Sequence, residues 1–404
     1  MCVFEDFGRG GGTFMKHIRM FRIALVVLGA SFAISSAMAD DKLRDLKPKY
    51  TSLMTVSGYT GETELENFPV AVRISPETIS GFKYEKCDGQ GDISFTDVDG
   101  NILPHEIEVW NTAGESVAWV SVPKLSTVVA EDTTTYTTFK MHWGHEKKLA
   151  DSKPQDVWSV STYNGVWHLA ESSGEIKDSS SAARGMSVVT TRSCGTTTDE
   201  AKIGSAFWVK SSEDSNGAEA VLKTNKGFTM GYSSDCTVTG WIYISNFAGN
   251  NNNPIGPYKK SNTYYWQLYP YSSWSKVLLR FKSTEATTTA ANLAPKKAGW
   301  FHYTVVIHKK ANFDLYVNGE YSGSYTPKKD GSVQTGYYKY GEVDRDYFYL
   351  YLCGYPGYLD ETRIRDTLSS DDWIKAEYDS INNKQFVVAA EATKNSYGLS
   401  VIVR

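Results

Sequence analysis

A run of aromatic residues in the middle of the chain supplies the side chains that carbohydrate binding requires. The segment from Tyr258 to Trp274 contains five tyrosines and two tryptophans, and four asparagines precede it at positions 250–253. Aromatic rings stack on the flat C–H faces of sugars, and amides hydrogen-bond to their hydroxyl groups. The competing interpretation is a long hairpin whose alternate aromatic side chains fill a core. We predict a ligand-binding set of Tyr264, Trp266, Tyr269, Tyr271, Trp274 and Asn252.

Two pairs of carboxylates are the next candidates for chemistry. Glu106 and Glu108 are two residues apart, so a strand would place both on one face. Glycosidases use two carboxylates, one of them as the acid. We interpret this pair as the polar face of a strand and assign no catalytic residue. Asp360 and Glu361 are adjacent, which predicts opposite faces, with Asp360 tying a loop or joining the edge of the core.

Two sequences resemble metal sites without completing one. Residues 95–106 nearly fit a calcium-binding loop, but Phe95 takes the first ligand position and the flanks read as strands, so we predict a strand turn. His142 and His145 have H-x-x-H spacing next to Glu146, yet no third zinc ligand is evident. Phosphate-loop, dinucleotide-binding and nucleophile-elbow motifs do not occur in the sequence.

Composition favours a globular β protein. The 404 residues include 42 Lys and Arg against 46 Asp and Glu, for a formal net charge of -4. A partner held by phosphate contacts would need a basic face, so we expect no nucleic-acid partner. Aromatic residues make up 13% of the chain, which suits large β-sheet surfaces.

The N-terminus has the features of a secretory signal. A positively charged region contains Lys16, Arg19 and Arg22 and leads into an apolar run that reaches Ile34. An A-x-A pattern, typical of a signal-peptidase site, ends at Ala39. We predict cleavage after Ala39, with the residues before Met15 as an upstream extension. A retained membrane anchor is the alternative, and no membrane span is expected after signal removal. The chain would then be secreted, to the periplasm or to the cell exterior or surface.

Export would leave four cysteines in an oxidising compartment, where disulfides form. Four cysteines allow three complete pairings, and their spacing does not choose among them. The four are Cys87, Cys194, Cys236 and Cys353.

Short segments rich in β-branched and aromatic residues predict strands along the whole exported chain. Asn318-Gly319 is a strong hairpin signal, because both residues tolerate positive φ. One helix is expected from Ser369 to Ile381, capped by Ser369 or Ser370. The predicted strands are 68–74, 118–122, 136–143, 238–244, 277–281, 300–308 and 313–317.

The first half resembles the domain of unknown function 2341. The motifs that carry this resemblance occur in the expected order and cover about residues 50–145. They are Asn67–Val70, Arg73-Ile74, Gly91–Asp97, Asp99-Gly100, Leu103–Trp110, Ala118–Pro123 and Trp143-Gly144.

The second half resembles a laminin-G-like, concanavalin A-type jelly roll over about residues 155–382. The motifs are Val166–Leu169, Phe228-Thr229, Thr239–Ile242, Trp300–Val306, Leu315–Gly319, Tyr358–Ile364 and Asp371–Ile374. Such folds mostly bind glycans or proteins, and some relatives are glycosidases or lyases. Because relatives often bind calcium, the resemblance leaves calcium open as a cofactor, with no ligands assigned and no other cofactor implied.

These observations predict an all-β chain, with a small antiparallel β-sandwich followed by a concanavalin A-like jelly-roll sandwich. The expected function is non-catalytic binding of carbohydrate or a cell-surface polymer. A structural or adhesive protein that binds other proteins is one alternative, and a glycoside hydrolase or polysaccharide lyase is another. The expected divisions are a signal segment at 1–39, the first domain at 40–148, a linker at 149–156, the jelly roll at 157–384 and a tail at 385–404.

Overall fold

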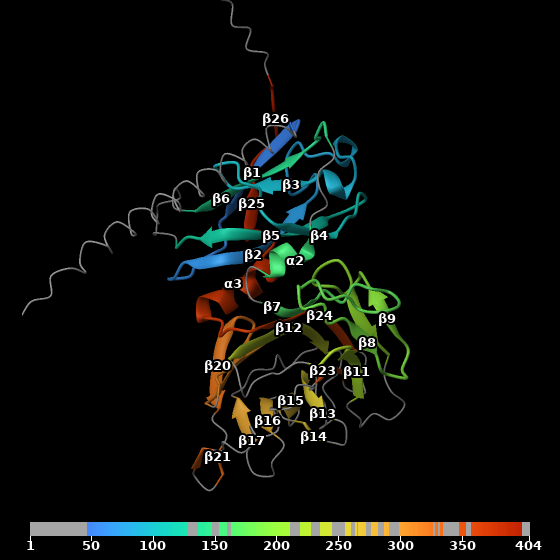
Figure 1. Cartoon of the computed structure of the whole chain (residues 1–404), viewed down its shortest axis with the longest axis vertical. Coiled ribbons are helices and arrows are strands. Elements are labelled where there is room, and N and C mark those ends of the chain that lie inside the picture. The colour runs from blue at the N-terminus through green and yellow to red at the C-terminus, as the bar shows by residue number, and fades with distance from the viewer. Residues whose placement is uncertain are drawn as a thin grey trace, which may run out of the picture.

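Two β-sandwiches follow one another along the long axis of the molecule (Figure 1). The predicted signal segment, residues 1–39, lies outside the part of the chain that the computed structural model describes. Among the described residues, no helix combines the length and apolar character needed to cross a membrane. The structure describes residues 47–127, 136–147, 153–159, 163–210, 219–227, 235–244, 255–259, 263–264, 266–271, 276–281, 287–290, 299–309, 311–325, 328–329, 332–333, 347–352 and 357–397.

The first of these, here called the N-terminal sandwich, packs a five-stranded sheet against a three-stranded one. The larger sheet has the order β25-β1-β6-β3 with β26 also on β1, and the smaller has the order β2-β5-β4. Phe82, Phe95, Phe139 and Trp143 are buried in its core. The elements contributed by the first part of the chain are β1 (Tyr50–Val56), β2 (Leu65–Ile74), β3 (Ser94–Thr96), β4 (His105–Val109), β5 (Ser116–Leu125), β6 (Thr137–Trp143) and the 3-10 turns η1 (Tyr84–Lys86) and η2 (Gln90–Asp92).

The end of the chain completes this first sandwich. We expected residues 385–404 to form a tail, whereas β25 (Val387–Ala389) and β26 (Thr393–Lys394) pair antiparallel with β1. Phe386 is 1% exposed and belongs to the same core. The N-terminal sandwich therefore consists of two stretches of sequence with the jelly roll between them.

The second sandwich, here called the jelly roll, has two sheets, each with eight strands among the described residues. The near sheet, named for its position toward the N-terminal sandwich, has the order β20-β19-β18-β12-β24-β10-β9 with β7 on β24. The far sheet has the order β17-β16-β15-β13-β23-β11-β8 with β14 on β13. Val238, Ile242 and Val305 of the near sheet share one core with Leu222 and Leu350 of the far sheet. The predicted all-β fold with two sandwiches is confirmed.

The predicted strands of both sandwiches are confirmed, and so is the hairpin turn, where Asn318 and Gly319 have φ values of 54° and 80°. The near sheet comprises β7 (Tyr163–Trp167), β9 (Cys194–Thr197), β10 (Ala206–Val209), β12 (Cys236–Ile244), β18 (Gly299–Ile307), β19 (Phe313–Val317), β20 (Glu320–Tyr325) and β24 (Gly357–Arg365). The far sheet comprises β8 (Met186–Val188), β11 (Glu219–Thr224), β13 (Ile255–Lys259), β14 (Thr263–Tyr264), β15 (Trp266–Tyr271), β16 (Lys276–Phe281), β17 (Thr287–Ala290) and β23 (Tyr347–Leu352). A separate pair is formed by β21 (Lys328–Lys329) and β22 (Ser332–Val333).

Two helices pack where the sandwiches meet. The short helix α2 (Pro154–Ser159) begins within the expected linker, 149–156, extends beyond it, and buries Val157 and Trp158 in the core of the N-terminal sandwich. The predicted C-terminal helix is confirmed as α3 (Asp371–Asn382), and Ser370 caps it by accepting a hydrogen bond from the Trp373 backbone N–H. Both helices therefore fix how the two sandwiches pack together.

The N-terminal sandwich covers the outer face of the near sheet. Side chains on a strand alternate between its two faces. Val238 and Ile242 of β12 accordingly enter the jelly-roll core, while Trp241 packs with the N-terminal core. Figure 1 shows β12, β24 and β7 toward the N-terminal sandwich and β13, β15 and β16 on the opposite side of the jelly roll.

Candidate functional site

The predicted aromatic site belongs to the far sheet. Tyr264 lies in β14, which pairs with β13, and Trp266, Tyr269 and Tyr271 lie in β15. The pairing of β15 with β16 runs from Trp266 opposite Phe281 to Tyr271 opposite Lys276. Trp274 and Asn252 lie outside the described residues. Ligand binding by this set stays a prediction, but its strands occupy the sheet away from the N-terminal sandwich.

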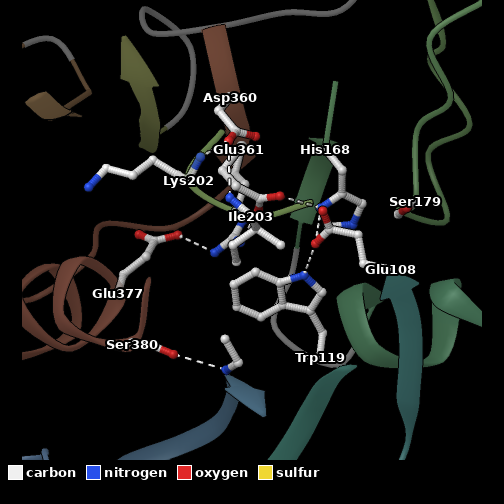
Figure 2. Close-up of polar contacts among 12 residues, drawn as sticks. Glu108, Trp119, His168, Ser179, Lys202, Ile203, Asp360, Glu361, Glu377 and Ser380 are labelled. Atoms are coloured by element: carbon white, nitrogen blue, oxygen red, sulfur yellow. Dashed lines mark hydrogen bonds and ion pairs between the residues drawn. The ribbon is translucent and has the colours of Figure 1, made fainter. Parts of the chain in front are cut away.

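A second site, not anticipated from the sequence, lies between the two sandwiches. It is a buried group of charged side chains drawn from both, with its tryptophan neighbours, and we call it the junction cluster (Figure 2). Strands β4 and β5 of the N-terminal sandwich meet the end of β7, the strand β24 and the helix α3 there. The cluster comprises Glu106, Glu108, Trp119, Trp158, His168, Asp360, Glu361, Arg363 and Glu377.

His168 occupies the centre of the junction cluster and contacts three carboxylates. Its Nδ1 atom lies 2.7 Å from Glu361 Oε1 and 3.3 Å from Glu108 Oε2. Its Nε2 atom lies 3.2 Å from Glu106 Oε2. Two of these carboxylates come from the N-terminal sandwich and one from the jelly roll, so His168 links the sandwiches.

Tryptophan side chains fix the two carboxylates of β4. Trp158 donates its indole N–H to Glu106 Oε2 at 2.5 Å, and Ser179 donates its hydroxyl to Glu106 Oε1 at 2.8 Å. Trp119 donates its indole N–H to Glu108 Oε2 at 2.6 Å. Glu106 and Glu108 do share one strand face, as predicted, but that face is buried against the jelly roll.

Arg363 neutralises the carboxylates from the jelly roll and α3. It forms ion pairs with Glu361 and with Glu377, the latter at 3.0 Å between Nη1 and Oε1. Its guanidinium also lies 4.3 Å from the ring centroid of Trp119 and 4.9 Å from that of Trp158. Guanidinium stacks on aromatic rings more readily than ammonium does, which suits arginine to this dry site.

A β-bulge brings adjacent carboxylates of β24 into the same cluster. The register between β12 and β24 shifts at this point, and Glu361 has a φ of 50°. Glu361 reaches His168, while Asp360 accepts hydrogen bonds from the backbone N–H groups of Lys202 and Ile203. The prediction that Asp360 ties a loop is confirmed. The prediction that Asp360 and Glu361 point to opposite faces of the strand was wrong, because the regular alternation of side chains stops at the bulge.

Burial and mutual charge shift the acid–base properties of the cluster. Burial alone would lower the pKa of His168, but the carboxylates of Glu361, Glu108 and Glu106 raise that pKa well above its ordinary value. Burial, reinforced by the neighbouring Glu361 charge, raises the pKa of Glu108 to about 8. Despite burial, His168 and Arg363 lower the pKa of Glu361 to about 2. The cluster therefore combines groups whose pKa values are shifted in opposite directions.

The three carboxylates around His168 are enclosed by the described residues. The side chains of Glu106, Glu108 and Glu361 are 10%, 3% and 0% exposed. Glycoside hydrolysis needs two carboxylates on either side of a bound sugar. The enclosed cluster offers no such arrangement, and its contacts are those of an interdomain junction.

The other side chains considered as metal ligands form hydrogen bonds within the N-terminal sandwich. Asp97 accepts hydrogen bonds from the backbone N–H groups of Asp99 and Asn101, so the predicted strand turn is confirmed. His142 lies within hydrogen-bonding distance of the hydroxyls of Thr51 and Thr96. His145 contacts Asp92, with 3.0 Å between Nδ1 and Oδ1. Cys87 and Cys194 are free cysteines, and Cys353 lies outside the described residues.

Three central members of the junction cluster were not identified as functional candidates from the sequence. His168 and Arg363 were noted only within jelly-roll motifs, and Glu377 only within the expected helix. The signal that could have indicated them is the density of charge in β24, where four of the nine residues Gly357–Arg365 are charged although the strand is almost entirely buried. Buried charges require partners, so such a strand implies opposite charges facing it.

Comparison with known families matches the larger part of the jelly roll. Residues 214–375 match the family described as the concanavalin A-like lectin/glucanases superfamily. The jelly roll is a concanavalin A-like domain. No curated protein sequence matches the chain. The resemblance of the first half to the domain of unknown function 2341 stays a prediction.

Solved structures with distant similarity to the chain include three toxin domains. The binding domain of Paraclostridial Mosquitocidal Protein 1 has 14% identity and a TM-score of 0.39, covering 55% of this chain and 53% of that one. The Botulinum neurotoxin serotype G binding domain has 12% identity and a TM-score of 0.38, covering 54% and 50%. The serotype D ligand binding domain in complex with N-acetylneuraminic acid has 15% identity and a TM-score of 0.37, covering 54% and 51%. The match spans about half the length of these structures, and similarity this low transfers no function from them to the concanavalin A-like domain.

Proposed function

We propose that the chain is a non-catalytic binding protein that recognises a carbohydrate or cell-surface polymer through the far sheet of its concanavalin A-like domain. The observation that carries the proposal is the placement of the aromatic segment. Strands β13, β14 and β15 belong to the far sheet, while the N-terminal sandwich lies on the near sheet (Figure 1). The described strands of the aromatic segment are therefore on the side that an extended ligand could approach.

The near sheet is poorly suited to the same role. On its outer face Trp241 is 1% exposed and His302 is 1% exposed. Trp241 stacks on Tyr378 of α3 with 5.4 Å between ring centroids, and Lys202 lies over the same indole at 4.0 Å. Aromatic side chains on this face are thus used to pack the sandwiches together.

The junction cluster favours binding over hydrolysis. The carboxylates that the sequence offered as a catalytic pair, Glu106 and Glu108, are enclosed and hydrogen-bonded by tryptophans. An acid and a nucleophile need direct contact with the glycosidic bond. The strand carboxylates of this chain therefore support the junction instead of a reaction.

A glycan and polysaccharide array probed with the purified chain, in calcium and in EDTA, tests the proposal. We expect specific binding that Trp266→Ala or Trp274→Ala reduces at least tenfold. Tyr321→Ala is the matched control, because Tyr321 is an exposed aromatic residue of β20 in the other sheet and is 55% exposed. Loss of binding in EDTA would add a calcium requirement.

The result that would overturn the proposal is a folded chain that binds no glycan on the array. Glycan binding equally unaffected by Trp266→Ala and Trp274→Ala would instead move the site elsewhere. We further propose export, with cleavage after Ala39. N-terminal sequencing of the protein recovered from the periplasm or the culture medium tests that step, and a retained residue Met15 would contradict it.

A further inference from the structure

One histidine and two glutamates of the junction cluster have the arrangement of metal ligands. One atom from each of Glu108, His168 and Glu361 lies within 4.8 Å of the other two. Two atoms bound to one tetrahedral zinc ion at ordinary bond lengths are about 3.3 Å apart. His168 Nδ1 and Glu108 Oε2 are separated by 3.3 Å, and His168 Nδ1 and Glu361 Oε1 by 2.7 Å. Of these two pairs, the first already has the spacing of two zinc ligands, and the second would have to move apart.

Each of the three side chains is oriented by a further partner. His168 directs Nε2 at Glu106, while its other nitrogen, Nδ1, faces Glu108 and Glu361. A histidine that binds a metal usually donates its second ring N–H to a carboxylate in this way. Trp119 orients Glu108, and Arg363 orients Glu361. These contacts set both carboxylates next to the imidazole before any ion is bound.

One carboxylate oxygen inside the cluster has no hydrogen-bond partner among the described residues. Glu108 Oε1 is buried and has no hydrogen-bond partner among the described residues, and the side chain is 3% exposed. An unpartnered carboxylate oxygen in a dry site is costly. The unpaired oxygen therefore indicates that the cluster can accept another cationic partner.

We propose that the junction cluster binds one divalent transition-metal ion, with zinc as the best match, through His168 Nδ1, Glu108 and Glu361. Imidazole nitrogen with carboxylate oxygen suits zinc, whereas calcium takes oxygen ligands alone. Glu108 Oε1 or a water molecule would complete the coordination. Because Glu108 comes from β4 and the other two ligands from the jelly roll, the ion would hold the two sandwiches together. This inference does not depend on the proposed glycan function.

The competing arrangement is a proton at the same place. A doubly protonated His168 would donate one N–H to Glu361 and the other to Glu106, with no ion present. The two arrangements differ in what they predict for metal content and stability, so experiment distinguishes them directly.

The enclosed position dictates how the ion must be supplied. The ligands are buried where the sandwiches meet, so we expect the ion to bind as the chain folds. The full chain should be refolded from denaturant in zinc, in cobalt or in chelator, and excess metal should be removed by gel filtration. We expect about one equivalent of zinc by mass spectrometry, and a thermal midpoint about 5 °C or more above that of the chelator-refolded chain.

Variants of the proposed ligand residues locate the site. The visible spectrum of the cobalt-refolded native chain provides a second test that does not require those variants to fold. Glu108→Gln and His168→Gln should lose the bound zinc and the rise in thermal midpoint. His308→Gln should retain both, and it controls for adventitious binding, since His308 pairs with Asp314 just after β18, where the two side chains are 30% and 16% exposed. If the first two variants do not fold, the cobalt-refolded native chain decides through its visible absorption. Less than one tenth of an equivalent of zinc in the native chain, or cobalt without tetrahedral bands, would overturn the proposal in favour of the protonated histidine.

Discussion

Gly58, which follows β1, is in direct contact with Phe386, which precedes β25 near the end of the chain. Gly58 donates its backbone N–H to the Phe386 carbonyl at 3.0 Å. A Cβ atom on residue 58 would lie 2.6 Å from Phe386 Cα, so only glycine fits without a shift of the backbone. The contact couples the C-terminal segment to β1 beyond the pairing of β25 with that strand.

Phe386→Ala should therefore destabilise a domain that lies at the other end of the sequence. Removing a buried phenylalanine side chain costs about 3–5 kcal/mol through lost burial and the cavity that remains. Denaturant unfolding followed by tryptophan fluorescence measures the change. Val388→Ala is the matched control: Val388 follows closely in β25 but is 40% exposed, so its loss should cost below about 1 kcal/mol. Equal effects of the two variants would mean that Phe386 does not belong to the core.

Arg363→Met should remove the arginine that pairs with two buried carboxylates, Glu361 and Glu377. Breaking a buried ion pair by removing one partner costs about 3–5 kcal/mol. Urea unfolding of the variant would show this loss. The free energy of unfolding of Arg363→Lys should lie between those of the native chain and Arg363→Met, because ammonium cannot make both contacts with the same geometry. Lys375→Ala, which removes the partly exposed pair with Asp379, should change the free energy of unfolding by less than about 1 kcal/mol. A stable Arg363→Met variant would show that the carboxylates do not depend on this arginine.

His142 should make the N-terminal sandwich sensitive to acid. Burial, aided by the nearby His145 and Lys140, lowers the pKa of His142 from 6.5 to about 3. The unfolded chain then binds the proton that the folded chain excludes, so stability is complete above pH 6.5 and falls as the pH drops toward 3. Each pH unit in that window should cost about 1.4 kcal/mol for this residue.

His142→Gln should reduce that slope. Urea unfolding of both proteins at pH 4, 5, 6 and 8 supplies the comparison. The two free energies of unfolding should diverge by about 1.4 kcal/mol per unit below pH 6 and run parallel above pH 7. Parallel curves across the whole range would mean that His142 becomes protonated in the folded state without cost.

Local patterns in the sequence accounted for much of the fold. The predicted helix was confirmed because Ser370 and the acidic first turn are signals within a few residues of the helix start. The turn at Asn318 and Gly319 was confirmed for the same reason, since positive φ favours these two residue types. Alternating β-branched and aromatic residues predicted the strands of both sandwiches. These features depend on neighbours in the sequence.

The junction cluster depends on contacts that no local pattern specifies. Glu106 meets His168 only because β4 packs against the end of β7, and His168 meets Glu361 only because a bulge turns β24. The two-residue spacing of Glu106 and Glu108 correctly predicted that they share one strand face. It did not predict that this face packs against the jelly roll. The pairing of β25 with β1 was missed for the same physical reason.

The return of β25 to β1 has a consequence for the order in which the chain can fold as it is synthesised. Without β25 and β26, β1 is the edge strand of its sheet, with unpaired backbone groups that can capture another chain. The ribosome adds the whole jelly roll before it adds β25, so the first sandwich to emerge is the last to be completed. A nascent chain carries this open edge throughout that interval, and cutting the chain after the first sandwich would make the open edge permanent.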